Sequence, residues 1–294
     1  MTPAEAPILG RCSLRSEEAG EELAGTASEI RRWLLVEHPG PWGRDALRDA
    51  RMSRRLSAAL RSTQKRTGAR VLLIRRPDHA PGDRLSCFAV DTREVWLGKR
   101  TLERIEDAGG LDPWERAPFR TLSGPLAIVC THGRRDPCCA ERGRSLAASA
   151  SSFGLTWEST HIGGDRFAGN LVLFPHGLYF GRVDPERAAE VIGAYGEGRI
   201  VLDLFRGRSS RSMPVQAAEH ALRTTLGLDG VGDAVPERIH PETGDVFATT
   251  FATSAGRYVV RVRRARGTPM RLTCHSVLEE TPPSWRLVGI DPAP

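Results

Sequence analysis

Features of membrane and secreted proteins are missing from this 294-residue chain. No apolar run approaches the roughly 20 residues that a membrane-spanning helix needs. The N-terminus, MTPAEAPILGRC, lacks the basic start and apolar stretch of a signal peptide. Six cysteines are too few for a disulfide framework in a chain of this length. We therefore expect a cytoplasmic protein without a membrane partner.

Lysine is scarce, since Lys65 and Lys99 are the two lysines among 42 basic residues, and the net charge is +6. A basic protein can attract nucleic acid or other acidic partners. The densest basic run, RYVVRVRRARGTPMR at 257–271, alternates arginine with valine, which predicts a strand with one solvated arginine face. We therefore expect no nucleic-acid partner.

The order strand, helix, strand, hairpin, helix is predicted twice along the chain. The first copy consists of a strand at 33–38, a helix at 44–66, a strand at 70–76, a hairpin at 85–100 and a short helix at 101–110. The second consists of a strand at 125–130, a helix at 138–153, a strand at 155–160, a hairpin at 171–183 and a helix at 184–198. This order is typical of thioredoxin-like folds, in which helices cover both faces of a mixed sheet. The pattern predicts an α/β protein with two tandem thioredoxin-like halves, at 1–120 and 121–206.

The composition changes after the second copy. Residues 206–212, RGRSSRS, are predicted to be a polar linker. A helix at 213–228 and several strands follow, with Cys274 in the segment RLTCHSV, which we predict to be a strand. Residues 207–294 are thus predicted to be a small α+β module.

Clustered cysteines follow the first strand of the second half. Cys130 ends this strand and Cys139 opens the next helix, whose positive N-terminal end favours a thiolate over a thiol. His161 follows the neighbouring strand, so the three side chains are expected to converge. Asp165, four residues later, would add an oxygen donor from the same loop. In a cytosolic chain, such clustered cysteines indicate a metal-binding or a catalytic site.

These two loops also carry a family resemblance. The pattern C-x-H-x-x-R-D-x-x-C at 130–139, followed by H-x-G-G-x-x-F-A-G-N at 161–170, resembles the sucrase/ferredoxin-like family. The resemblance covers roughly residues 124–205 and implies a thioredoxin-like ferredoxin domain. In eukaryotic members with this pattern, two cysteines and two histidines hold a 2Fe–2S cluster.

Transferred position by position, the resemblance implies that Cys130, Cys139 and His161 are cluster ligands. The fourth family position holds Asp165 instead of histidine. Three outcomes stay open: Asp165 completes the cluster, Cys138 does so, or the cluster is labile or absent. The implied function is single-electron transfer or redox sensing with a reductase or acceptor protein as partner, and not that of a stand-alone enzyme. Sucrase activity is not supported, because Asp136 is better explained as a helix cap than as one of two catalytic carboxylates.

Two other functions are compatible with these residues, and several residues are expected to have structural roles. A thiol oxidoreductase would use Cys138 or Cys139, although the chain has no C-x-x-C motif. A structural zinc site would accept the same sulfur, nitrogen and oxygen donors. We expect Cys138 to pack into the fold and His132 to form hydrogen bonds within its loop. Cys12 and Cys87 are expected to be small buried apolar residues.

Overall fold

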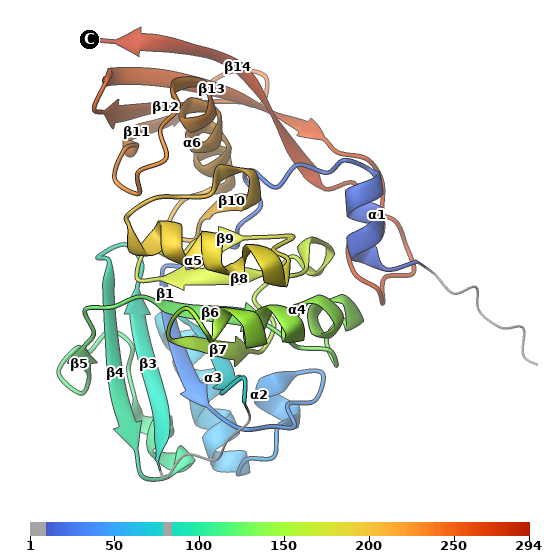
Figure 1. Ribbon diagram of the computed structural model, residues 1–294, viewed down its shortest axis with the longest axis vertical. Helices are drawn as coiled ribbons and strands as arrows, with labels where there is room; N and C mark the ends of the chain where they lie inside the picture. The colour runs from blue at the N-terminus through green and yellow to red at the C-terminus, as the bar shows by residue number, and fades with distance from the viewer. Residues whose placement is uncertain (1–9, 79–83) are drawn as a thin grey trace, which may run out of the picture.

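The computed structural model describes residues 10–78 and 84–294, and its N-terminal part opens with helix α1, Cys12–Glu18. The first half follows (Figure 1). Its elements are β1 Arg32–Glu37, α2 Ala46–Asp49, α3 Arg54–Thr67, β2 Arg70–Arg75, β3 Leu85–Asp91, β4 Trp96–Leu102, the 3-10 helix η1 Ile105–Gly110 and β5 Arg120–Thr121.

The second half repeats this arrangement. Its elements are β6 Leu126–Cys130, α4 Pro137–Ala150, β7 Thr156–Ser159, the 3-10 helix η2 Asp165–Phe167, β8 Leu171–Phe174, β9 Leu178–Phe180, the 3-10 helix η3 Pro185–Arg187, α5 Ala188–Gly196, the 3-10 helix η4 Leu202–Leu204 and β10 Phe205–Arg208. Each half has a parallel strand pair: β1 and β2 are joined through α2 and α3, and β6 and β7 are joined through α4. The first strand of that pair also pairs antiparallel with a hairpin.

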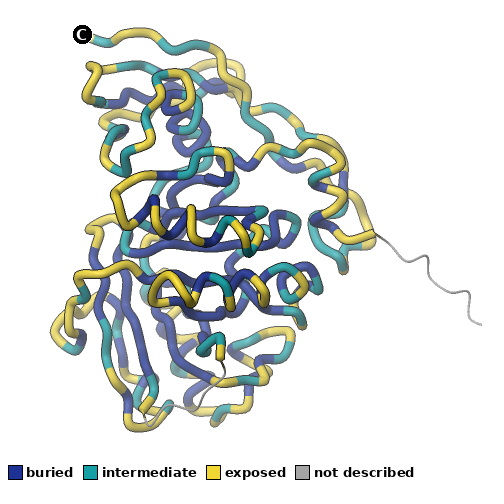
Figure 2. The backbone as a smooth tube through the Cα atoms, in the orientation of Figure 1, coloured by how far each residue is buried: buried dark blue, intermediate teal, exposed yellow. Residues whose placement is uncertain are grey.

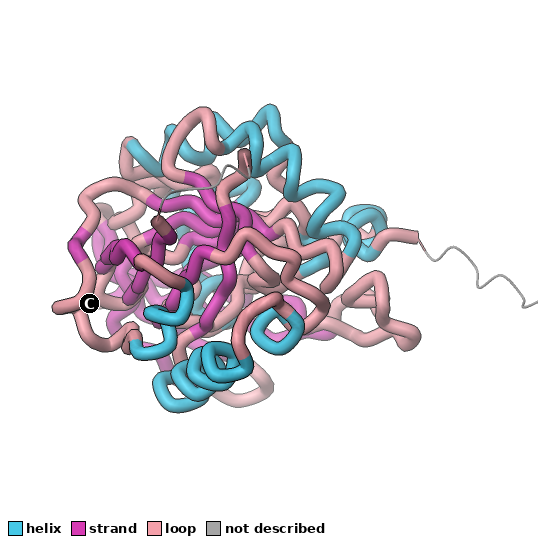
Figure 3. Tube along the Cα trace, turned by 90° about the horizontal axis from the view of Figure 1, so that it is seen from below, coloured by secondary structure: helices cyan, strands magenta, loops and turns pink. Residues whose placement is uncertain are grey.

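One ten-stranded sheet runs through both halves in the order β10-β9-β8-β6-β7-β2-β1-β3-β4-β5. The two halves meet where β2 pairs antiparallel with β7. Helices lie on both sides of the strands (Figure 3). The predicted α/β class with two thioredoxin-like halves is therefore confirmed.

The core follows from the alternation of side chains along the strands. In β1, Leu34 and Val36 pack with residues of α3, while Trp33 and Leu35 belong to a second cluster that contains residues of both halves. The ring of Trp33 lies 5.3 Å from that of Phe174 in β8. The two halves thus bury one sheet face against each other, and the central strands are buried throughout (Figure 2).

The C-terminal module is a four-stranded antiparallel sheet with one helix. It comprises α6 Met213–Leu226, β11 Val235–Pro241, β12 Val246–Thr253, β13 Gly256–Arg266 and β14 Pro283–Ala293. In β13, Val260 and Val262 are buried with residues of α6. Arg257 and Arg261 form ion pairs with acidic residues on the other face. The basic run is thus a solvated sheet face, as predicted.

Three element predictions were wrong. The segment 44–66 forms two helices, because the chain is extended at Ala50 and at Ser53. The side chain of Ser53 caps α3. The predicted linker at 206–212 begins with β10, in which Arg206 and Arg208 are buried. Cys274 lies outside regular strands, in the long connection between β13 and β14. Figure 1 shows this connection beside α1 at one edge of the molecule.

Candidate metal centre

Cys130 is fixed by the junction between β6 and α4. Alternation along β6 places it on the same inner face as Leu126 and Ile128. Its backbone N–H donates to the carbonyl of Asn170 at 3.1 Å. Helix α4 crosses the strand end so closely that a Cβ at Gly143 would lie 2.1 Å from the Cys130 carbonyl oxygen. Glycine at 143 therefore sets the distance between the helix and the strand end.

The start of α4 has the predicted cap. The Asp136 carboxylate accepts a hydrogen bond from the Cys138 backbone N–H at 3.0 Å, and Pro137 is the first helical residue. Both residues favour the start of a helix. The Asp136 carboxylate accepts from an N–H that has no partner within the helix, and the φ of Pro137 already has a helical value. Cys139 therefore enters the first turn of a well-defined helix.

The second loop leaves β7 and turns sharply into η2. Gly163 and Gly164 have φ values of +102° and +80°, which L-residues with side chains rarely adopt. The Asn170 side chain donates to the Gly164 carbonyl at 2.7 Å, and Phe167 is fully buried. The turn brings His161 and Asp165 back toward the end of β6.

The structure brings together the three ligands implied by the resemblance and Asp165, which occupies the fourth family position. The donor atoms of Cys130, Cys139 and His161 all lie within 4.8 Å of one another. Asp165 Oδ1 lies 3.2 Å from Cys139 Sγ and 3.0 Å from His161 Nδ1. His161 Nδ1 is buried without a well-directed hydrogen bond among the described residues. Two sulfurs, one imidazole and one carboxylate thus face a common point.

Electrostatics favour the charged forms of Cys130 and His161 and the neutral form of Cys139. Interactions with Cys139 and His161 lower the pKa of Cys130 well below its usual value. The contact with Cys130, together with burial, raises the pKa of Cys139. Burial opposes protonation of His161, but Asp165 and Cys130 outweigh it and raise the pKa of His161 to about 9. Burial and the neighbouring donors thus determine the protonation state of each residue in this group.

The group is closed to solvent except at one side. Cys130 and Cys139 are each 1% exposed and Asp165 is buried, whereas the His161 side chain keeps 21% exposure. The imidazole is therefore the part of this group that is exposed to solvent.

A comparison with protein families matches residues 23–207 to the sucrase/ferredoxin-like model. The chain belongs to the sucrase/ferredoxin-like family. The family match begins ahead of β1 and ends in β10, so it includes both halves of the large sheet.

Curated relatives share a shorter region. The chain is 32% identical over 99 residues to "Altered inheritance of mitochondria protein 32" of Meyerozyma guilliermondii, matching 29% of this chain and 35% of the relative. It is 33% identical over 111 residues to the protein of the same name of Debaryomyces hansenii, matching 32% and 41%. The chain thus spans well under half of the length of these relatives.

Solved structures of small ferredoxins are also similar. The thioredoxin-like [2Fe-2S] ferredoxin from Aquifex aeolicus is 18% identical, with a TM-score of 0.27, and the match covers 30% of this chain and 94% of the ferredoxin. Its Cys55Ser variant is 19% identical, with a TM-score of 0.26, and the match covers 28% and 97%.

Arg206 supports the second loop of this family member, a role that was not predicted from the sequence. The side chain is buried and donates to Asn170 Oδ1 at 2.6 Å and to the Gly163 carbonyl at 3.3 Å. Its guanidinium lies 4.7 Å from the Phe167 ring centroid. The sequence shows only an arginine in a basic, serine-rich run, so no signal marked it as buried.

His132 forms hydrogen bonds, as expected, but the partners of its ring lie outside its own loop. One ring nitrogen lies 2.7 Å from the Gly43 carbonyl in the first half, and the other accepts from the His161 backbone N–H at 3.2 Å. The loop PGPWG, which stands where the second half has its cysteines, thus supports the His161 loop through His132.

Cys138 lies apart from this group. It contacts Cys12 and Cys274, with sulfur–sulfur distances of 3.7 Å and 3.3 Å. The prediction that Cys12 merely fills space was therefore incomplete. The sequence gives no signal for this contact, because the three cysteines are separated by more than a hundred residues.

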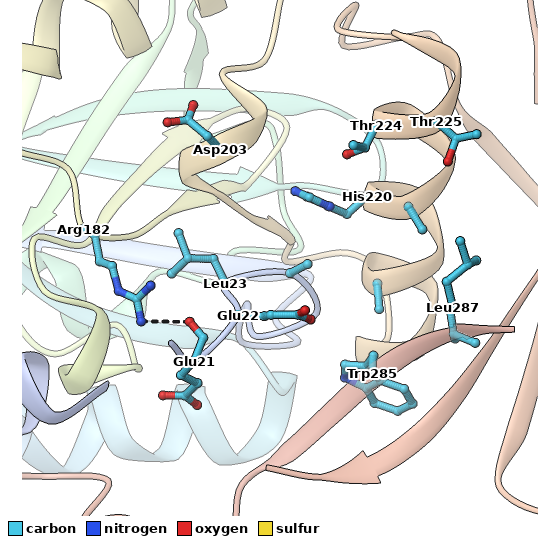
Figure 4. Close-up of a pocket in the computed structure, with 14 residues that line it drawn as sticks. Glu21, Glu22, Leu23, Arg182, Asp203, His220, Thr224, Thr225, Trp285 and Leu287 are labelled. Atoms are coloured by element: carbon cyan, nitrogen blue, oxygen red, sulfur yellow. Dashed lines mark hydrogen bonds between the residues drawn. The ribbon is translucent and has the colours of Figure 1, made fainter. Parts of the chain in front are cut away.

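A pocket of about 470 Å³ lies elsewhere, between the segment at 21–24, α6 and β14 (Figure 4). Arg182 on its wall donates to the Glu21 carbonyl at 2.9 Å. No cysteine lines this pocket. It is therefore separate from both groups of thiols.

No helix in the described ranges 10–78 and 84–294 has the length and apolar character needed to cross a membrane.

Proposed function

We propose that this chain is a thioredoxin-like ferredoxin that holds a 2Fe–2S cluster with Cys130, Cys139, His161 and Asp165. The observation that carries the proposal is the convergence of four donors from two loops at adjacent strand ends. A 2Fe–2S cluster needs four protein ligands, and histidines replace some cysteines in known centres. The cluster would supply a one-electron couple for exchange with a redox partner protein.

The donor set predicts the direction of the redox potential. Two thiolates, one neutral imidazole and one carboxylate carry less negative charge than four thiolates and more than two thiolates with two imidazoles. Fewer negative ligands stabilise the reduced state, and so bis-histidine centres have higher potentials than all-cysteine centres. We therefore expect a potential between those of the two classes. It should lie below that of bis-histidine centres because Asp165 is a negative ligand.

The remaining parts of the site have distinct tasks. The buried cysteines exclude water from the metal ligands, and Arg206 with Asn170 holds the second loop in its turn. The partly exposed His161 would give electrons the shortest path between the cluster and a docked partner protein. Its side chain also holds a proton next to Asp165 when the metal ligands are free.

A single zinc ion is a second candidate, favoured by one specific observation. The donor atoms of Cys130, Cys139 and His161 all lie within 4.8 Å of one another, which suits ligands of one ion. Asp165 would then be the fourth ligand of a tetrahedral site. Such a centre would stabilise the two loops without transferring electrons.

Two other functions have less support. A thiol that attacks a disulfide must be accessible, but Cys138 and Cys139 are both buried. Hydrolysis of a glycosidic bond needs two carboxylates beside an open substrate site. Asp136 and Asp165 are both buried, and each already interacts with a neighbouring residue.

Metal and sulfide analysis of the full chain tests the proposal. Anaerobically purified protein is expected to contain two irons and two acid-labile sulfides, and to give an EPR signal after dithionite reduction. Cys130→Ser should lose both components. Cys87→Ala removes a buried cysteine of the first half and should keep them. Wild-type protein without iron or sulfide that contains zinc which is lost in Cys130→Ser would favour the second candidate.

A further inference from the structure

A second group of donors lies at the start of α4, outside the proposed cluster. The sulfurs of Cys12, Cys138 and Cys274 form a triangle with sides of 3.7, 3.3 and 3.6 Å. The Asp136 carboxylate oxygens lie 3.8 Å and 3.7 Å from Cys12 Sγ. One donor atom from each of the four residues can be chosen so that all lie within 4.8 Å of one another.

We propose that Cys12, Cys138, Cys274 and Asp136 bind one zinc ion. Zinc prefers four ligands in a tetrahedron, with sulfur at about 2.3 Å, so two sulfurs on one ion should lie roughly 3.7 Å apart. The three sulfur–sulfur distances are close to this separation without any rearrangement. A carboxylate oxygen is an accepted fourth ligand.

Neighbouring groups already orient these donors. The Ser13 hydroxyl donates to Cys138 Sγ at 3.3 Å, and the Cys12 backbone N–H donates to Cys274 Sγ at 3.5 Å. The Cys274 N–H donates to Asp136 Oδ2 at 2.7 Å. Hydrogen bonds of this kind fix the ligands of known metal sites and stabilise their negative charge.

No basic side chain forms an ion pair with the carboxylate of the group among the described residues, although Arg11 and Arg142 are close enough to attract its sulfurs. Asp136 is fully buried and takes part in no ion pair within residues 10–78 and 84–294. The arginines nearby have other partners, since Arg11 pairs with Glu141 and Arg142 pairs with Glu17. Burying carboxylate and sulfur donors without a cation is costly, and a divalent ion removes this cost.

Other uses of the three cysteines fit less well. All three are free, and their separations exceed the roughly 2.05 Å of a disulfide bond. One disulfide would also leave the third thiol unpaired. A zinc ion uses all three, and its binding releases their protons to solvent.

The site would join three distant parts of the chain. Cys12 belongs to α1, Cys138 to α4 and Cys274 to the connection between β13 and β14, which lies beside α1 in Figure 1. A metal that links residues far apart in sequence reduces the entropy of the unfolded chain. Zinc would thus fasten the N-terminal helix and the C-terminal module to the half that carries the proposed cluster.

The test is zinc analysis of the full chain expressed with zinc and purified without chelators. We expect one tightly bound zinc per chain, with an X-ray absorption spectrum that fits three sulfurs at about 2.3 Å and one oxygen. Cys12→Ser and Cys274→Ser should each lose this zinc while iron and sulfide stay at the wild-type level. Cys87→Ala should retain it.

Three results would overturn the inference. The first is wild-type protein without zinc. The second is zinc that persists in both Cys12→Ser and Cys274→Ser but disappears in Cys130→Ser, which would assign it to the other centre. The third is a disulfide between Cys138 and Cys274 in protein alkylated before denaturation. Wild-type protein that contains this zinc but no iron would instead overturn only the proposed cluster.

Discussion

Cys138 and Cys139 are neighbours in the chain but belong to different groups of donors. Cys139 Sγ lies 3.2 Å from Asp165 Oδ1, whereas Cys138 Sγ lies 3.3 Å from Cys274 Sγ. Successive helix residues point about 100° apart, so one turn of α4 presents the two sulfurs to different sides. The start of this helix therefore contributes to both proposed metal sites.

This geometry predicts opposite outcomes for two adjacent substitutions. Cys139→Ser should lose the 2Fe–2S absorption and EPR signal, because it removes a thiolate ligand of the cluster. Cys138→Ser should keep most of the cluster and lose the zinc. Iron, sulfide and zinc are measured on the same preparations. Full cluster content in Cys139→Ser together with its loss in Cys138→Ser would show that the ligands are assigned to the wrong neighbours.

Asp165→His should preserve iron binding and raise the midpoint potential of the cluster. The substitution replaces a negative ligand with a neutral one, which favours the reduced state. A redox titration followed by EPR measures the change against wild type. A lower potential in the variant would contradict ligation by Asp165.

A buried charge network in the C-terminal module predicts acid sensitivity. Burial opposes ionisation of Glu219, but Arg211, Arg208 and Arg223 outweigh it and lower its pKa to about 2, below the usual 4.5. The native state therefore favours the carboxylate more strongly than the unfolded state does. This stabilisation is present above pH 4.5 and is lost as the pH falls toward about 2.

Glu219→Gln should lower the free energy of unfolding at pH 7 by about 3–5 kcal/mol, since it leaves buried arginines without their partner. Urea unfolding at pH 7 and at lower pH values measures the loss. Glu190→Gln removes the partner of Arg187 at the surface and should cost less than about 1 kcal/mol. Equal losses in the two variants would contradict the importance of the buried network.

Gly143→Ala should disturb the junction between β6 and α4. The added Cβ would lie 2.1 Å from the Cys130 carbonyl oxygen, so the helix must move away from the strand. We expect a loss of about 3 kcal/mol, at the upper end of overpacking costs, and reduced cluster content. Thermal unfolding and iron analysis measure both effects.

Gly193→Ala in α5 is the matched control, because its Cβ would meet no atom within 4 Å. It should be neutral or stabilise the protein by up to about 1 kcal/mol. A similar loss in both variants would mean that the close approach at Gly143 is unimportant.

Much of the large sheet was predictable from local patterns. The hairpins β3–β4 and β8–β9 follow turn signals between apolar runs, and α4 begins with Pro137 after the capping residue Asp136. The burial of Arg206 was not predictable, because its partners Gly163 and Asn170 are supplied only by the tertiary fold. The break in the predicted helix at Ala50 was missed, although Ser53, three residues later, is a capping-type residue and caps α3.

The candidate centre was predictable because its donors lie in two short loops at adjacent strand ends. Cys130 and Cys139 are nine positions apart, and His161 follows the next strand. The second group was hidden, because Cys12 and Cys274 lie near opposite ends of the sequence. Their contact with Cys138 depends on where α1 and the β13–β14 connection pack.

EPR spectroscopy of freshly isolated full-length protein, together with iron and sulfide analysis, tests the central claim most directly. The account predicts two irons and two sulfides per chain, and a spectrum of one unpaired electron after reduction that disappears in Cys130→Ser and His161→Ala. A wild-type protein that is fully folded but contains neither iron nor sulfide when isolated anaerobically would contradict it.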